Sequence, residues 1–238
     1  MIARLLTVLP LAFSAACSVA DTGLRPEHGR LAVAWVRHAP ERVALCEQAY
    51  RAATTALRHE AASARANDSR PLAVVVDVDE TVLDNSSYNA GLVARGESFQ
   101  PQTWSAWVEE RAAPPIPGAV AFARTAAELG VTVFYVTNRT AAEEAATRDN
   151  LRALGFPLQD DGDAGFDAVL TRGERAGWEG SAKASRRAAV ARTHSVVLYV
   201  GDDRGDFPAE GPEAFGETWF VLPNPMYGSW VRALPPDA

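Results

Sequence analysis

The chain has 238 residues, 47% of them hydrophobic, so it can bury a full core, and we expect one domain with a modest insertion. Its formal charge of -7 argues against a nucleic-acid polymer as partner, because phosphate backbones are bound by clusters of Lys and Arg. A single small phosphorylated ligand remains compatible with an acidic chain, provided that a local cation reverses the field inside the site.

Residues 1–20 are predicted to be a secretory signal peptide. An apolar run at residues 5–13, too short to span a bilayer as a helix, is followed by small residues. Two forms of processing are open. Cys17 could become a lipidated first residue, as in a bacterial lipobox, although Ser14 stands where Leu is usual; alternatively, cleavage could follow Ala20. We expect an exported protein, either periplasmic or an outer-membrane lipoprotein anchored at Cys17.

The region 31–62 is rich in Ala, and its apolar residues recur at helical spacing. Pro40 interrupts the pattern, which predicts two helices with a kink between them. Cys46 lies within this pattern and is expected to be a buried apolar residue rather than a nucleophile. Because Cys17 lies outside the folded core, no intramolecular disulfide is expected. The polar tract 63–71 then acts as a linker.

Short apolar runs bounded by turn residues follow, and they predict five strands at 72–78, 131–138, 167–172, 195–203 and 218–225. Helices are predicted at about 141–154, closed by Gly155, and at about 182–192. Strands that are apolar throughout and separated by helices indicate an α/β fold with a parallel sheet that helices cover on both faces.

The segment 85–117, between the first two predicted strands, is too long for a simple crossover. It carries Trp104 and Trp107 among acidic and small residues, and we expect it to form a helical cap or insertion over the site. Together with the N-terminal helices it would make a small helical subdomain. Residues 28–238 are then expected to form a single domain.

Polar residues lie at the carboxyl ends of three of the predicted strands. They are Asp77 and Asp79 at the end of the first strand, Thr137, Asn138 and Arg139 at the end of the second, and Asp202, Asp203 and Asp206 at the end of the fourth. In parallel sheets the site lies at the carboxyl ends of the strands, so we expect these side chains to converge on one edge.

Hydrolysis of a phosphate ester needs a nucleophile, neutralisation of the phosphoryl oxygens and a proton for the leaving oxygen. Asp77 is the candidate nucleophile and Asp79 the candidate acid and base. Asp202 would complete a hard-oxygen site for Mg²⁺, together with Asp77 and the backbone carbonyl of Asp79. Lys183 would add a fixed positive charge, and the hydroxyl of Thr137 would donate to a phosphoryl oxygen.

Six segments of the chain resemble, in order, motifs of the class C acid phosphatases of the haloacid dehalogenase (HAD) superfamily, subfamily IIIB, which include bacterial outer-membrane lipoprotein 5'-nucleotidases. The segments are DVDETVLDNSSY, WSAWVEERAAPPIPGA, VTNR, KASRR, GDDRGDF and LPNPMYGSW. The resemblance runs from about Trp35 to Trp230. It implies a Rossmann-like core, a Mg²⁺-dependent phosphomonoesterase and the residue roles given above. On this basis Asp203 or Asp206 is expected to bond a water on the metal.

The resemblance also implies an aromatic cleft that stacks a nucleoside base, for which Trp104 and Tyr227 are the candidates. The candidate contacts to the substrate are Thr137, Asn138, Arg139 and Lys183. Thr137 and Asn138 could instead, or in addition, cap the following helix, and Arg139 could pair with an acid.

We therefore expect an exported, Mg²⁺-dependent phosphatase that acts on small phosphomonoesters, with nucleoside monophosphates as the favoured substrates, through an aspartyl-phosphate intermediate. One alternative is a broad acid phosphatase without base recognition. Another is a surface lipoprotein that binds a ligand and has weak catalysis. The sequence leaves open whether the chain forms a homodimer.

Overall fold

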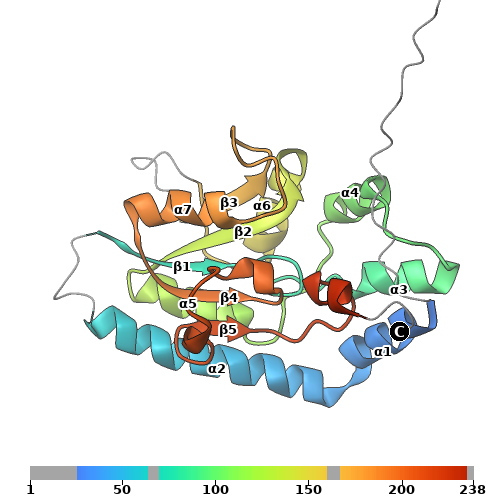
Figure 1. Cartoon of the computed structure of the whole chain (residues 1–238), viewed down its shortest axis with the longest axis horizontal. Coiled ribbons are helices and arrows are strands. Elements are labelled where there is room, and N and C mark those ends of the chain that lie inside the picture. The colour runs from blue at the N-terminus through green and yellow to red at the C-terminus, as the bar shows by residue number, and fades with distance from the viewer. Residues whose placement is uncertain (1–25, 64–69, 160–166, 235–238) are drawn as a thin grey trace, which may run out of the picture.

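The structure is a computed structural model that describes residues 26–63, 70–159 and 167–234 (Figure 1). The predicted signal peptide, with Cys17, and most of the predicted linker at 63–71 lie outside the described residues. Among the residues described, no helix combines the length and the apolar character needed to cross a membrane.

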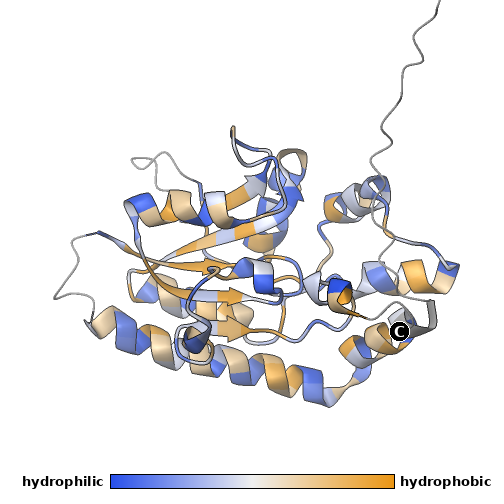
Figure 2. Cartoon of the chain, in the orientation of Figure 1, coloured by the Kyte–Doolittle hydropathy of each residue, from blue (hydrophilic) through white to orange (hydrophobic). Residues whose placement is uncertain are grey.

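A five-stranded sheet with the order β3-β2-β1-β4-β5 forms the centre, and all of its strand pairs are parallel. The strands are β1 (Leu72–Val76), β2 (Thr132–Thr140), β3 (Val169–Arg172), β4 (Ser195–Gly201) and β5 (Trp219–Val221). Val75 of β1 pairs with Phe134 of β2 on one side and with Tyr199 of β4 on the other. The predicted parallel α/β sheet is confirmed, and Figure 2 shows the apolar residues along its strands.

Helices cover both faces of the sheet because successive side chains of a strand point in opposite directions. On one face, Val74 and Val76 join a large apolar cluster with residues of α2 (Pro40–Ser63), α5 (Ala119–Glu128) and α6 (Glu144–Leu154). On the other face, Ala73 and Val75 join a smaller cluster with α7 (Ala184–Thr193). β1 is therefore buried on both faces, as its continuous apolar run predicts.

Three more helices gather beyond the carboxyl ends of the strands (Figure 1): α1 (Pro26–His38), α3 (Ser86–Arg95) and α4 (Pro101–Glu109). α1 contacts α3, and Ala39 separates α1 from α2, so the expected break at Pro40 is present. Cys46 on α2 is buried and free.

Two elements differ from the sequence-based expectation. Helix α5 was not predicted, although its buried residues Ala119, Phe122, Ala123 and Ala126 have helical spacing. β5 ends at Val221, four residues earlier than expected, because the rest of the run contains Pro223 and Pro225, which have no N–H to donate to a neighbouring strand.

Candidate active site

Asp77 is the first residue after β1, and its side chain is buried. Its backbone N–H donates to the carbonyl of Val200 in β4 over 2.9 Å, so the sheet pairing continues one residue beyond the strand. The chain then turns sharply. Glu80 has a φ of 59°, which is uncommon for a residue other than glycine, and its carboxylate accepts from the backbone N–H of Asn85 over 2.9 Å. This turn keeps Asp77 and Asp79 at the same edge of the sheet.

Asp77 lies beside two carboxylates that come from the β4 side. β1 and β4 are neighbours although β2 and β3 lie between them in the sequence, and open α/β sheets bind ligands at such a switch point. Asp202 follows β4, and Asp206 ends the short helix η3 (Arg204–Asp206). One carboxylate oxygen from each of the three residues lies within 4.8 Å of the other two. The expected convergence of Asp77 and Asp202 is therefore present in the structure.

Lys183 immediately precedes α7 and reaches into this cluster. Its Nζ donates to Oδ1 of Asp206 over 2.6 Å and to Oδ1 of Asp77. All three side chains are buried. Burial alone would lower the pKa of Lys183, but the carboxylates of Asp206 and Asp77 outweigh burial and raise the pKa above its ordinary value. Lys183 is thus held as a cation between two of the carboxylates.

The cluster holds three carboxylates and one ammonium, so it has an excess of negative charge. Burial, followed by the charge of Asp206, raises the pKa of Asp77 to about 7. Burial, followed by Asp77 and Asp206, raises the pKa of Asp202 well above its ordinary value. A cation among these oxygens would relieve the repulsion, and carboxylate oxygens are the ligands that hard divalent cations prefer. The residues therefore fit a divalent metal ion.

Asp206 and Asp203 play different parts in the turn after β4. Oδ2 of Asp206 accepts from the backbone N–H of Asp202 over 3.1 Å and of Asp203 over 2.9 Å. The carboxylate of Asp203 accepts instead from the backbone N–H groups of Gly205 and Ser229. Burial would raise the pKa of Asp203, but these hydrogen bonds lower it. Asp203 or Asp206 was expected to bond a water on the metal. Asp206 lies in the carboxylate cluster, whereas Asp203 bonds the backbone of the turn after β4 and of the segment at Ser229.

Both carboxylate oxygens of Asp202 accept side-chain hydrogen bonds. Oδ1 accepts from Oγ1 of Thr81 over 3.2 Å, and Oδ2 accepts from Nδ2 of Asn224 over 2.7 Å. Tyr50 in turn donates its buried hydroxyl to the carbonyl of Thr81 over 2.7 Å. The orientation of Asp202 is therefore fixed from the loop after β1 and from the segment after β5.

Asp79 pairs with Arg139, which follows Thr137 at the end of β2. Nε and Nη2 of Arg139 donate to Oδ1 of Asp79 over 3.0 and 2.8 Å. Oδ2 of Asp79 accepts from Oγ1 of Thr137 at 3.4 Å. The guanidinium of Arg139 also donates to Thr147 and is 1% exposed. Of the two readings left open for Arg139, this geometry matches pairing with an acid.

The end of β2 is held by Arg186, one turn into α7. Its Nη1 donates to the carbonyl of Thr137, and its Nη2 donates to Oδ1 of Asn138 over 2.7 Å. Thr137 is fully buried, whereas Asn138 is exposed. Arg186 belongs to the KASRR segment but was not predicted to have a role. The signal that could have identified it is its spacing of three residues from Lys183, because residues three apart lie on the same side of a helix.

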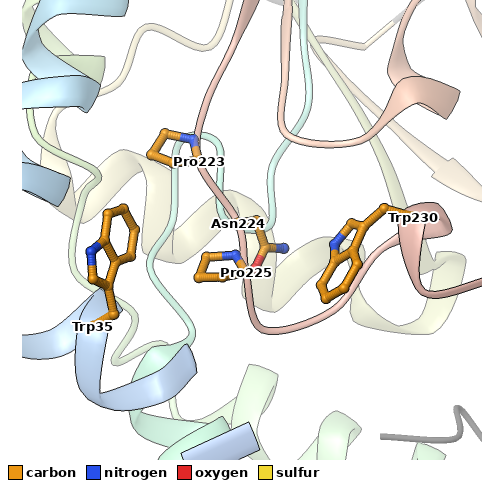
Figure 3. A pocket seen from close by; sticks show the side chains of 5 residues that line it. All are labelled: Trp35, Pro223, Asn224, Pro225 and Trp230. Atoms are coloured by element: carbon orange, nitrogen blue, oxygen red, sulfur yellow. The ribbon is translucent and has the colours of Figure 1, made fainter. Parts of the chain in front are cut away.

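A pocket of about 600 Å³ opens beside Asn224, the residue that donates to Asp202 (Figure 3). Trp35 from α1 and Trp230 from the short helix η5 (Ser229–Ala233) lie on opposite sides of Asn224 and Pro225. These two aromatic residues were not named as candidates, although they mark the two ends of the segment that resembles the family.

Of the two predicted aromatic residues, Trp104 lies on the α4 side of the site. It packs against Tyr88 with ring centroids 5.2 Å apart, and Arg139 lies over its ring at 5.5 Å. Tyr227 lies beside the pocket: it packs against the same apolar cluster as Trp35, and its carbonyl accepts from Nε1 of Trp230 over 3.2 Å. Within the described part of the chain, neither lines the pocket beside Asn224.

Comparison with known proteins agrees with the geometry. The family model described as "HAD superfamily, subfamily IIIB (Acid phosphatase)" matches residues 26–230. The class C acid phosphatase from Bacillus anthracis is 30% identical, with a TM-score of 0.74 over 86% of this chain and 87% of that chain. The structure of that enzyme with tungstate bound gives 31% identity and a TM-score of 0.74, over 87% of this chain and 88% of that one. The resemblance inferred from the motifs is confirmed.

Curated plant proteins also match, over a shorter region. Acid phosphatase 1 from Solanum lycopersicum is 29% identical over 64% of this chain and 57% of its own length. The stem 28 kDa glycoprotein from Glycine max is 25% identical over 64% of this chain and 58% of its own length. The chain thus spans less than two thirds of these curated relatives.

Proposed function

Because the chain belongs to subfamily IIIB of the HAD superfamily, the acid phosphatases, we propose that it hydrolyses small phosphomonoesters. The observation that carries the proposal is the cluster of Asp77, Asp202 and Asp206 around Lys183 at the switch point of the sheet. The cluster places a candidate nucleophile, a fixed cation and hard-oxygen ligands for a metal side by side. Phosphoryl transfer requires these three groups.

Asp77 is the nucleophile of the proposed reaction. Lys183 donates to its Oδ1, and the hydrogen bonds of the described residues leave Oδ2 without a donor, so Oδ2 is the oxygen available for attack. Attack on phosphorus forms an aspartyl phosphate and breaks the ester P–O bond, and the leaving oxygen takes a proton from Asp79 to give the alcohol. Water then attacks the same phosphorus, Asp79 takes the proton, and the bond from Asp77 to phosphorus breaks. Thr137 and Lys183 are the proposed donors to phosphoryl oxygens.

Mg²⁺ is the proposed metal, held by the carboxylates of Asp77 and Asp202 and by the backbone carbonyl of Asp79. When bound, it would neutralise negative charge on the phosphoryl oxygens and on the carboxylates. The excess negative charge of the cluster supports this assignment. Asp206 supports the site through Lys183 and through the backbone of Asp202 and Asp203.

Nucleoside monophosphates are the proposed substrate class. The pocket between Trp35 and Trp230 adjoins Asn224, which bonds Asp202, so a base stacked there would lie next to the phosphate site. Stacking on indole rings tolerates different bases. A broad acid phosphatase would lack this preference, and a ligand-binding lipoprotein would have weak turnover. Export, with or without a lipid at Cys17, remains part of the proposal because of the predicted signal peptide at 1–20.

The test is phosphate release by the protein from residue 20 onward. A nucleoside 5'-monophosphate and an aryl phosphate are supplied separately, each with Mg²⁺ or with chelator. We expect Mg²⁺-dependent release that favours the nucleotide and is lost in Asp77→Asn. Equal release from the two esters would favour the broad phosphatase. An Asp77→Asn variant as active as the wild type would overturn the mechanism.

A further inference from the structure

Asn85 connects three parts of the site, and its side chain is fully buried. Its Nδ2 donates to Oδ1 of Asp79 over 2.9 Å. Its Oδ1 accepts from Nε1 of Trp107 over 2.8 Å and from Nη2 of Arg139 over 3.3 Å. Indole and guanidinium groups only donate, so the amide oxygen must face them and the amide nitrogen must face the carboxylate. The neighbours of Asn85 thus leave its amide only one orientation.

The two oxygens of Asp79 are bonded very unequally. Oδ1 accepts three hydrogen bonds, two from Arg139 and one from Asn85, at 2.8 to 3.0 Å. Within the described part of the chain, Oδ2 accepts only from Oγ1 of Thr137, at 3.4 Å. A carboxylate oxygen that already accepts three hydrogen bonds has no room for a proton. Oδ2 is therefore the oxygen that can carry one.

Helix α4 packs against this hydrogen-bond network. Trp107 comes from α4, and Ser105 on the same helix donates to Oε1 of Glu143 over 2.6 Å. Trp104, also on α4, covers the guanidinium of Arg139. Helix α4 thus contacts both residues that bond Oδ1 of Asp79: Trp107 donates to Asn85, and the ring of Trp104 lies over Arg139.

We propose that Arg139 and Asn85 are positioning residues that hold Oδ1 of Asp79 and leave Oδ2 as the proton-carrying oxygen, with Trp107 of α4 holding Asn85 in place. The inference rests on the proposed role of Asp79 as acid and base. As the ester P–O bond breaks, its electron pair stays on the leaving oxygen, and that oxygen takes the proton from Oδ2. In the second half, Oδ2 takes a proton from the attacking water.

Leaving-group dependence tests this inference, because a proton donor matters most when the leaving alcohol is weakly acidic. The wild type and its variants are assayed with Mg²⁺ on p-nitrophenyl phosphate and on an alkyl phosphate. In Arg139→Met and Asn85→Ala we expect kcat/KM on the alkyl ester to fall by about 10- to 100-fold, and kcat/KM on the p-nitrophenyl ester to fall much less. We compare kcat/KM because it reports the steps up to release of the alcohol, whereas kcat can be set by the second half, which is the same for both esters. Arg139→Lys should recover part of the loss.

Trp107→Phe is the mildest variant, because it removes the indole N–H and keeps an aromatic ring. It should change the ratio of the two rates in the same direction by about 3- to 10-fold. Trp178→Phe is the matched control, since Trp178 packs in the smaller apolar cluster on the other face of the sheet, and it should leave the ratio unchanged. Trp107→Phe decides the question if the Asn85 or Arg139 variants do not fold.

The assay distinguishes failure of the proposed function from failure of the positioning role. If the wild type cleaves neither ester, the proposed function fails and the inference fails with it. If the wild type cleaves both esters and Asp79→Asn changes the ratio of the rates, the proposed function stands. A folded Trp107→Phe or Arg139→Met variant that lowers kcat/KM for both esters by the same factor would then overturn the positioning role alone.

Discussion

Asp206 occupies the space that a side chain at position 201 would need. A Cβ built on Gly201 would overlap the Cβ and the carboxylate of Asp206. That carboxylate accepts from the backbone N–H groups of Asp202 and Asp203 and from Lys183. Glycine at position 201 is therefore what allows the turn after β4 to close around the carboxylate cluster.

Gly201→Ala is expected to lower the free energy of unfolding by about 1–3 kcal/mol, because the added methyl group forces Asp206 or the backbone to move. It should also weaken stabilisation by Mg²⁺, since Asp206 orients the backbone of Asp202. Chemical denaturation with and without Mg²⁺ measures both effects. Gly180→Ala is the control, because the nearest atom lies 4.0 Å from its added Cβ. An equal, small loss in both variants would contradict the steric argument.

The meeting of Asp77 with Asp202 could be predicted from the sequence alone. Each residue follows an apolar strand, and parallel strands bring their carboxyl ends to one edge, so no knowledge of distant packing was needed. The prediction for Lys183 depends on the family resemblance, because the helical pattern at about 182–192 alone suggests a solvated helix residue.

The pairing of Arg139 with Asp79 and the place of the aromatic pocket depend on packing between segments far apart in the chain. Arg139 is 60 residues from Asp79 in the sequence. The pocket forms between α1 and the segment after β5, so Trp35 and Trp230 line one pocket only when both ends of the described chain pack against the same edge. Local patterns carry no information on such contacts, so the sequence favours Trp104 although the structure places Trp35 and Trp230 at the pocket.

Asp77→Asn should lower kcat by at least about 1000-fold, because the nucleophile is lost. In chelator the variant should remain folded, with a free energy of unfolding no lower than that of the wild type. The reason is that one of three mutually repelling carboxylates has been neutralised, while Lys183 keeps its hydrogen bond to Asp206. Denaturant titration in chelator measures this; a large loss of stability would mean that the pair of Asp77 with Lys183 outweighs the repulsion.

Mg²⁺ should raise the midpoint of thermal unfolding, by the equivalent of about 2.7 kcal/mol at 100 times its Kd. Asp202→Asn should remove most of this gain. Asp203→Asn is a matched neighbour, because the Asp203 carboxylate bonds the backbone of Gly205 and Ser229 instead of facing the cluster. Asp203→Asn should lower the midpoint of thermal unfolding both with and without Mg²⁺, but the rise in the midpoint on adding Mg²⁺ should stay the same. Equal Mg²⁺ effects in the two variants would contradict the assignment of Asp202.

Trp230→Ala should raise KM for a nucleoside monophosphate by about 5- to 150-fold, the equivalent of about 1–3 kcal/mol for one stacked base. KM for a glycerol phosphate, which has no ring to stack, should change little. Trp104→Ala tests the residue that the sequence favoured. If Trp104→Ala gave the nucleotide-specific rise in KM and Trp230→Ala did not, the base would bind on the α4 side of the site.

Glu144, at the start of α6, should make stability depend on pH. Burial, followed by the carboxylates of Asp167 and Glu174, raises its pKa from 4.5 to about 7. The native state therefore binds this proton more tightly than the unfolded state does, and stability is lost as the pH rises from about 4.5 to about 7. Glu144→Gln should consequently stabilise the protein at pH 8 and have little effect at pH 4.5.

Denaturant unfolding of the wild type and Glu144→Gln at both pH values measures this difference. Removing a negative charge from an acidic chain could by itself add stability at pH 8, so Glu47→Gln serves as the control. Glu47 is exposed and, among the described residues, forms an ion pair with Arg51 alone, at 3.4 Å, a contact worth at most about 1 kcal/mol. A gain at pH 8 that is equal in both variants would show that net charge, rather than the neighbours of Glu144, is responsible.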